Sequence, residues 1–246
     1  MEYIIILILL LVAIATILFI FEFNIKKIKE ISKNDKMLEI SNKFPDNKEI
    51  CKYILKKLNN EKVNIKENTD GKDKTSLYVA ITDTIFIANI KDIYTRIQTV
   101  AHECIHSIQS RNMLLFNFIF TNVYAIYFFA ITIFSLFGKI QNYQLQIIML
   151  LIMAFIQYVV RSYLETDAMT RAEYLSKEYM EEYNKENEVC SEKEIEEITK
   201  KYAKINKMGI PAYNTILFVK AISKPCIYTI FVLCLNLIRY NINIVR

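Results

Sequence analysis

The sequence predicts a mainly α-helical protein that crosses a membrane several times and carries a small α+β domain outside it. Hydrophobic residues make up 53% of the 246 positions, yet there are 31 Lys+Arg and 26 Asp+Glu, so apolar and charged residues must lie in separate blocks. Three stretches contain no charged residue, namely 3–21, 112–138 and 140–160. Each is long enough to cross a bilayer, which takes about 20 apolar residues in a helix.

The blocks give the expected organisation. We expect an N-terminal transmembrane anchor at 1–22, a domain outside the membrane at 23–112, a two-span transmembrane hairpin at 113–160, further helices outside the membrane at 161–209, and a fourth transmembrane segment at 210–238.

The first apolar stretch is expected to be an uncleaved anchor rather than a signal peptide. Its leading segment, Met1-Glu2, carries one acidic and no basic side chain, and its apolar core exceeds the usual 7–15 residues. No small-x-small cleavage site follows it.

The fourth apolar stretch is less uniform, because it includes Lys220, Lys224 and Pro225. An interfacial or hairpin helix is the alternative. We favour a fourth span, in which the two lysines extend toward the near interface.

Basic residues predict the orientation of these spans. Five lysines follow the anchor between positions 26 and 36, and four more precede the fourth stretch between 200 and 207. The richer basic side is expected inside, so 22–112 and 161–209 should be cytoplasmic parts of a multi-pass protein of the cell membrane. The net charge of +5 is therefore a topology signal. No nucleic-acid partner is expected, since no nucleic-acid motif occurs.

Local patterns predict the elements of the domain outside the membrane. Asp46 is a plausible N-cap for a helix at 47–59. A short strand is expected at 62–66. Two β-rich runs at 76–81 and 84–89 can pair as a hairpin. A helix follows from about Asp92, and a capping box at 191–194 begins another.

The two histidines of the chain, His102 and His106, lie four positions apart, with Glu103 directly after the first. Positions i and i+4 share one face of a helix, so two imidazoles can bind one tetrahedral Zn²⁺. The intervening glutamate is the general base in this motif. Cys104 is turned about 200° from His102 and should face the core. These residues predict a zinc-dependent hydrolase with a zincin-like domain.

A catalytic zinc needs a third protein ligand, which here must be a carboxylate or a cysteine. Two spans separate His106 from residue 161, so segment 161–209 returns to the same side of the membrane. Glu165 is its first carboxylate and should emerge about as far from the bilayer as His106. We therefore expect Glu165, rather than Glu173 or Glu178, to complete the site.

Asp167 lies beside this expected ligand. It can pair with Arg171 across one helical turn and orient the helix. It can also accept an imidazole N–H as a second-shell partner of the metal.

Segments 102–109 (HECIHSIQ) and 165–172 (ETDAMTRA), separated by two spans, resemble the YugP-like neutral zinc metallopeptidases of bacterial membranes. The resemblance covers most of the chain. It implies that His102, His106 and Glu165 are zinc ligands and that Glu103 is the catalytic base.

Two residues depart from the family pattern. Ile105 stands where glycine is common, and Ser107 where alanine is common. Neither is a proposed ligand, but Ile105 adds bulk beside the motif.

The expected function is hydrolysis of peptide bonds in a peptide or protein substrate at the cytoplasmic surface of the lipid bilayer. Mn²⁺ or Co²⁺ could occupy the same ligands. The alternative from another class is a membrane scaffold or chaperone partner in which zinc serves only stability. A transporter is disfavoured because the spans hold no paired carboxylates.

Overall fold

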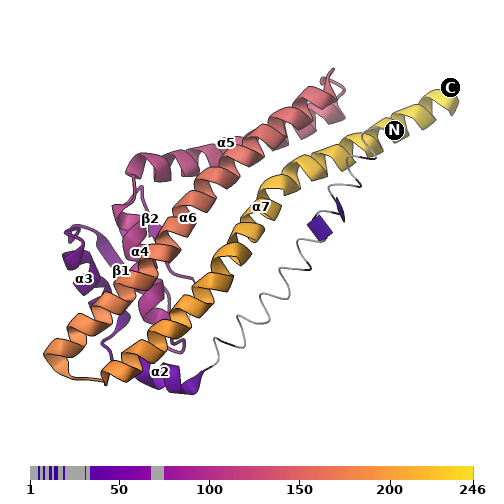
Figure 1. The fold of residues 1–246 in the computed structure, drawn as a ribbon. Helices are drawn as coiled ribbons and strands as arrows, with labels where there is room; N and C mark the ends of the chain where they lie inside the picture. Colours follow the sequence, from indigo (N-terminus) through magenta and orange to yellow (C-terminus); the bar gives the residue numbers. More distant parts are fainter. Residues whose placement is uncertain are drawn as a thin grey trace. The chain divides into compact units, whose positions relative to one another are not determined.

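The computed structural model describes residues 34–67 and 75–245, together with positions 5, 8, 11, 12, 14, 15, 19 and 31. Most of the anchor expected at 1–22 therefore lies outside the described residues. The described elements, shown in Figure 1, are α2 (Asp35–Asn42), α3 (Asn47–Lys57), β1 (Asn64–Glu67), β2 (Leu77–Val79), β3 (Thr84–Ile87), α4 (Arg96–Ile108), α5 (Arg111–Leu136), α6 (Tyr143–Asn187) and α7 (Glu192–Val245).

The chain divides into two compact units. We call Met1–Glu22, Phe116–Ser162 and Tyr213–Arg246 the helical unit, and Phe23–Leu115 and Tyr163–Ala212 the mixed unit. The mixed unit contains the sheet and α4. The fold is mainly helical with one small sheet, as predicted.

Caps set the first helices of the mixed unit. The side chain of Asn34 accepts a hydrogen bond from the backbone of Met37 and so begins α2, a helix that we did not predict. Asp46 begins α3 as predicted, accepting from the backbone N–H of Glu49 at 2.8 Å. Each cap satisfies a donor that the first helical turn leaves free.

The sheet has the strand order β1-β3-β2. β1 and β3 are parallel, while β2 and β3 form the predicted antiparallel hairpin, with Tyr78 opposite Ile85. Ile85 and Ile87 are fully buried and face the core that also contains the apolar side of α4. Because β2 comes last in the strand order, it is an edge strand in the described part of the sheet.

A buried arginine joins the start of α4 to the turn between α2 and α3. The Arg96 guanidinium donates four hydrogen bonds of 2.6–3.0 Å to oxygens of Ser41, Phe44, Pro45 and Asn47. These bonds compensate the burial of a cation, which would otherwise be costly. The helix predicted from about Asp92 begins only at Arg96, because residues 91–95 form a turn.

The boundaries expected at residues 161 and 210 do not end any helix. α6 continues from the third apolar stretch to Asn187, and α7 runs from Glu192 through Pro211 and Pro225 to Val245. The predicted capping box does begin α7, since Ser191 and Glu194 bond to each other's backbone N–H. A change from apolar to polar residues alters the surroundings of a helix without breaking its backbone hydrogen bonds.

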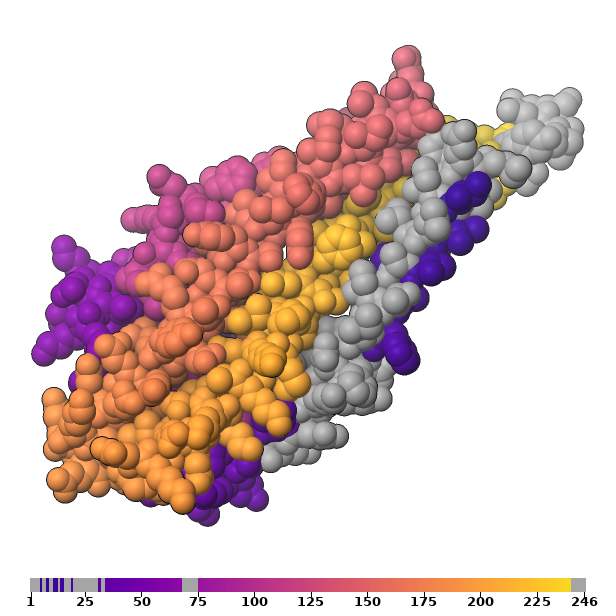
Figure 2. Space-filling view, viewed as in Figure 1, coloured from indigo at the N-terminus to yellow at the C-terminus, as the bar shows by residue number. Residues whose placement is uncertain are grey.

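The long helices of the helical unit are most of α5 and parts of α6 and α7. All three helices are long and apolar enough to cross a membrane. Their contacts are partly polar: the Tyr124 hydroxyl donates to the carbonyl of Ala221 at 2.9 Å, and Ser135 lies 2.8 Å from the Tyr228 hydroxyl. Elsewhere large apolar side chains such as Phe129 and Phe155 lie on the surface, and α6 is exposed along much of its length in Figure 2. An apolar exterior of this kind suits a lipid environment.

Candidate metal centre

Helix α4 presents the two histidines of the motif on one face. Its opposite face packs in the core through Ile97, Val100, Ala101 and Cys104, all fully buried. This amphipathic spacing turns His102 and His106 to the same side of the helix. Their Nε2 atoms lie 3.1 Å apart.

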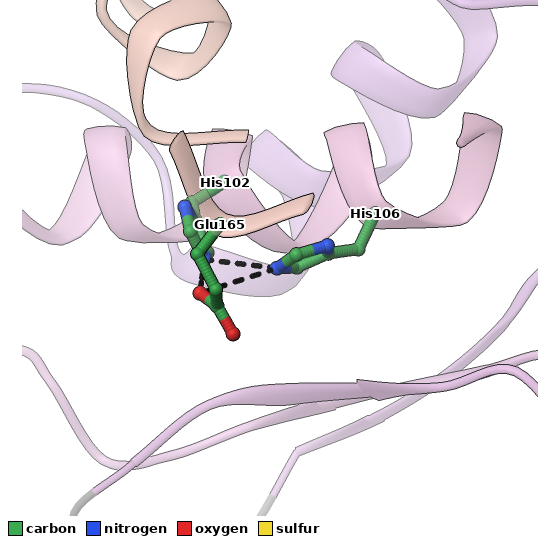
Figure 3. A group of neighbouring side chains, drawn as sticks. All are labelled: His102, His106 and Glu165. Carbon is green, nitrogen blue, oxygen red and sulfur yellow. Dashed lines mark hydrogen bonds and ion pairs between the residues drawn. The ribbon is translucent and has the colours of Figure 1, made fainter. Parts of the chain in front are cut away.

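Glu165, on α6, completes the group. Its Oε2 lies 3.6 Å from His102 Nε2 and 3.8 Å from His106 Nε2, and Figure 3 shows the three side chains pointing toward one another. The structure thus brings together the three residues expected from the sequence, and they form a group that could hold a metal ion.

The distances and donor types of this group fit a divalent metal ion such as zinc. A point equidistant from the three atoms lies about 2 Å from each, which is the usual Zn–N and Zn–O distance. Two imidazoles and a carboxylate form a ligand set typical of catalytic zinc, which keeps a fourth position for water or substrate.

Gln109 fixes the form of His106 that can bind a metal. The side-chain nitrogen of Gln109 donates to the Leu164 carbonyl at 2.8 Å and to Asp167 Oδ2 at 2.7 Å. Its oxygen must then face His106 Nδ1, which lies 2.8 Å away. Because an amide oxygen only accepts, Nδ1 carries a hydrogen, so in the neutral imidazole the lone pair that can bind a metal is on Nε2.

This arrangement changes the role expected for Asp167. We expected its carboxylate to accept an imidazole N–H directly, but it bonds to Gln109, and the Gln109 oxygen accepts from His106. The predicted pairing of Asp167 with Arg171 is present at 3.6 Å. Sequence reasoning missed Gln109, which lies three positions after His106 as the C-cap of α4, with an extended backbone. That spacing is its only local signal.

The other carboxylates considered as ligands have different partners. Glu173 accepts from Asn206 at 2.9 Å, and Glu178 pairs with Lys57 at 2.8 Å. Cys104 faces away from the histidines, as predicted, and its sulfur lies 3.6 Å from that of Cys51 in the core. Among these candidates, Glu165 alone joins the two histidines.

The charge state of Glu165 suits metal binding. Burial by itself would raise the pKa of this carboxyl, but its interactions with His102 and His106, whose Nε2 atoms lie 3.6 and 3.8 Å from Oε2, outweigh burial and hold the pKa well below its usual value. For His106, burial opposes the charged form, yet Glu165, 3.8 Å away, and the nearby charge of Glu103 raise its pKa. A metal ion at this site would compete with that proton for Nε2. The carboxylate is therefore ionised, the form in which it coordinates a metal.

Glu103 lies next to this group but is not one of its three members. The side chain is buried, and the backbone N–H of Tyr78 on β2 donates to its carboxylate. Burial raises the pKa of Glu103, because the attraction of the two histidines offsets only part of the desolvation. Glu103 thus connects the motif helix to the edge strand of the sheet.

No family model, curated protein or solved structure matches this chain in the comparisons.

Proposed function

We propose that this chain is a zinc-dependent metallopeptidase of the membrane, with a zincin-like catalytic domain formed by its mixed unit. The observation that carries the proposal is the convergence of His102, His106 and Glu165 beside the buried carboxylate of Glu103. A site serving only stability would not need Glu103, and it would favour a closed set of four protein ligands. The resemblance to the YugP-like metallopeptidases supports the same assignment.

The residues divide the chemistry of peptide hydrolysis among them. His102, His106 and Glu165 would hold Zn²⁺, which when bound supplies a Lewis acid that activates water and polarises a carbonyl. Glu103 accepts the proton of the attacking water and later delivers it to the departing amine. Gln109 keeps His106 in the tautomer that binds the metal.

The edge strand β2 is the proposed docking site for an extended substrate. The Tyr78 N–H points to Glu103 and away from β3. In an antiparallel ladder the N–H and C=O of one residue face the same side, so the Tyr78 carbonyl faces the same edge. A substrate peptide pairing with this edge would run directly past the general base.

The proposed substrates are peptide segments close to a membrane surface. Glu165 follows Val160, the last residue of the third uncharged stretch, by five positions in the unbroken helix α6. At about 1.5 Å per residue, this places Glu165 roughly 8 Å along the helix from the end of that stretch. The basic flanks assign this surface to the cytoplasm.

The test uses the full chain in detergent or vesicles, with metal analysis and peptide hydrolysis measured on the same samples. We expect about one zinc per chain, loss of zinc in His102→Ala, and loss of hydrolysis with retained zinc in Glu103→Gln. Retained hydrolysis in Glu103→Gln would exclude the proposed base. Retained zinc in a wild-type protein inert toward peptides and membrane-protein segments would favour a scaffold.

A further inference from the structure

The hairpin of β2 and β3, which belongs to the mixed unit, exposes apolar side chains. Leu77 on β2 is 47% exposed, and Ile81, in the turn after β2, is 53% exposed. The other face of the sheet is core, where Ile85 and Ile87 are fully buried. The hairpin therefore buries one apolar face and presents a second one.

The turn of this hairpin lies near the end of α4, a few residues before a membrane-length helix begins. The Tyr78 hydroxyl donates to Asp83, in the turn, at 2.8 Å. The carbonyl of Asp83 accepts from the backbone N–H of Asn64 at 3.0 Å, and the side chain of Asn60 donates to Ser107, near the end of α4, at 3.0–3.1 Å. Arg111 begins α5, whose following residues are apolar enough to cross a membrane. The turn is thus held near the point at which the chain would enter a bilayer.

Lys66 lies on the same face of the sheet as the exposed side chain of Leu77. Register places Leu77 opposite Phe86, and Phe86 beside Lys66 of β1, so the three side chains share the outer face of the sheet. The Lys66 ammonium lies 5.7 Å from the centre of the Phe86 ring. Apolar side chains flanked by cations are typical of surfaces that lie in a membrane interface, where the cations meet lipid phosphates.

We propose that the β2–β3 hairpin contacts the lipid bilayer, with Ile81 and Leu77 in the interface of the leaflet that α5 enters. Lipid is selected as the occupant of this apolar surface because the turn is hydrogen-bonded, through the segment 60–64, to Ser107, four residues before α5 begins. The contact would hold the edge strand at the membrane surface. It does not depend on peptidase activity.

The chain contains no tryptophan, so one introduced tryptophan reports on one position. The test variant is Ile81→Trp in the full chain, reconstituted in vesicles of phosphatidylcholine and phosphatidylglycerol. The membrane control is Phe129→Trp, at a position 61% exposed on α5. The control outside the membrane is Tyr174→Trp, at a position 68% exposed on α6 in the mixed unit.

Vesicles with acyl chains brominated near the glycerol end quench tryptophans that contact lipid. We expect about twofold quenching or more for Ile81→Trp and for Phe129→Trp, and little for Tyr174→Trp, because interfacial side chains lie about 5–10 Å into the headgroup and acyl boundary. Leu77→Trp serves as a second test variant if Ile81→Trp does not fold, and it should behave in the same way.

The proposal is overturned if these hairpin variants are unaffected by brominated lipid and are quenched by aqueous iodide as strongly as Tyr174→Trp. It is also overturned if the tryptophan is shielded only at high protein-to-lipid ratio, since a second copy would then cover the surface. The measurement involves no turnover, so it can succeed or fail independently of the peptidase assay.

Discussion

Replacing Gln109 by methionine tests whether this side chain prepares His106 for the metal. The substitution keeps the length and volume of the side chain but removes three hydrogen bonds of 2.7–2.8 Å, to His106, Leu164 and Asp167. A neutral hydrogen bond contributes about 1 kcal/mol net, and one to a charged group about 1.5–3 kcal/mol. The three hydrogen bonds together therefore contribute at most about 3–5 kcal/mol of free energy, which is shared between folding and metal binding.

The part of this free energy that affects metal binding comes from the hydrogen bond to His106. Loss of a partner that orients a ligand typically weakens metal binding about 10–100-fold, which corresponds to about 1.4–2.7 kcal/mol. We expect Gln109→Met to weaken zinc binding by this factor. Competition with a chromophoric chelator on the purified full chain measures it.

The matched control is Gln98→Met. Gln98 lies in α4, is buried, and its substitution removes one hydrogen bond of 2.9 Å to Asn206, which is not a proposed ligand. It should lower stability and leave zinc affinity unchanged. Asp167→Ala should weaken zinc less than Gln109→Met does, because Asp167 bonds to Gln109. Equal zinc affinity in Gln109→Met and wild type would refute this reasoning.

Two further predictions concern folding. Arg96→Met should lower the free energy of unfolding by about 3–5 kcal/mol, because four buried acceptors lose their donor; a urea midpoint unchanged from wild type would contradict this. Glu194→Gln should show a pH-dependent effect, because the hydrogen bond from Lys43 and the backbone of Ser191 lower the pKa of Glu194 to about 2. The carboxylate then stabilises the fold above its unfolded pKa of about 4.3, and this contribution is lost as pH falls to about 2. The difference in unfolding free energy between wild type and Glu194→Gln should shrink over that range, and a constant difference would argue against the cap.

The parts of the metal centre that follow local rules could be predicted from sequence. His102 and His106 needed only helical periodicity, and Glu165 needed only the count of spans that returns the chain to one side. Gln109 could not be assigned, because its partners Leu164 and Asp167 lie on another helix and no periodicity relates the two. The prediction of a direct contact between Asp167 and an imidazole was wrong for the same reason.

Helix ends were harder to predict where the environment changes. The change in polarity after Val160 was read as a boundary, but α6 continues through it with its backbone bonds intact. Pro211 and Pro225 also lie inside α7 rather than at its ends. Cap residues such as Asp46 and Ser191 gave correct starts because the cap is a local hydrogen bond.

The donors of the metal centre are made at different times during synthesis. The ribosome delivers His102 and His106 before α5 and the apolar part of α6 exist, and Glu165 appears only after both have been made. An ion bound early would be held by two side chains and easily lost. An ion bound after insertion would also bind Glu165, and it would then stabilise the closed loop between His106 and Glu165. Metal loading would then report that α5 and the apolar part of α6 have reached the membrane, and a nascent chain that failed to insert would remain a metal-poor precursor.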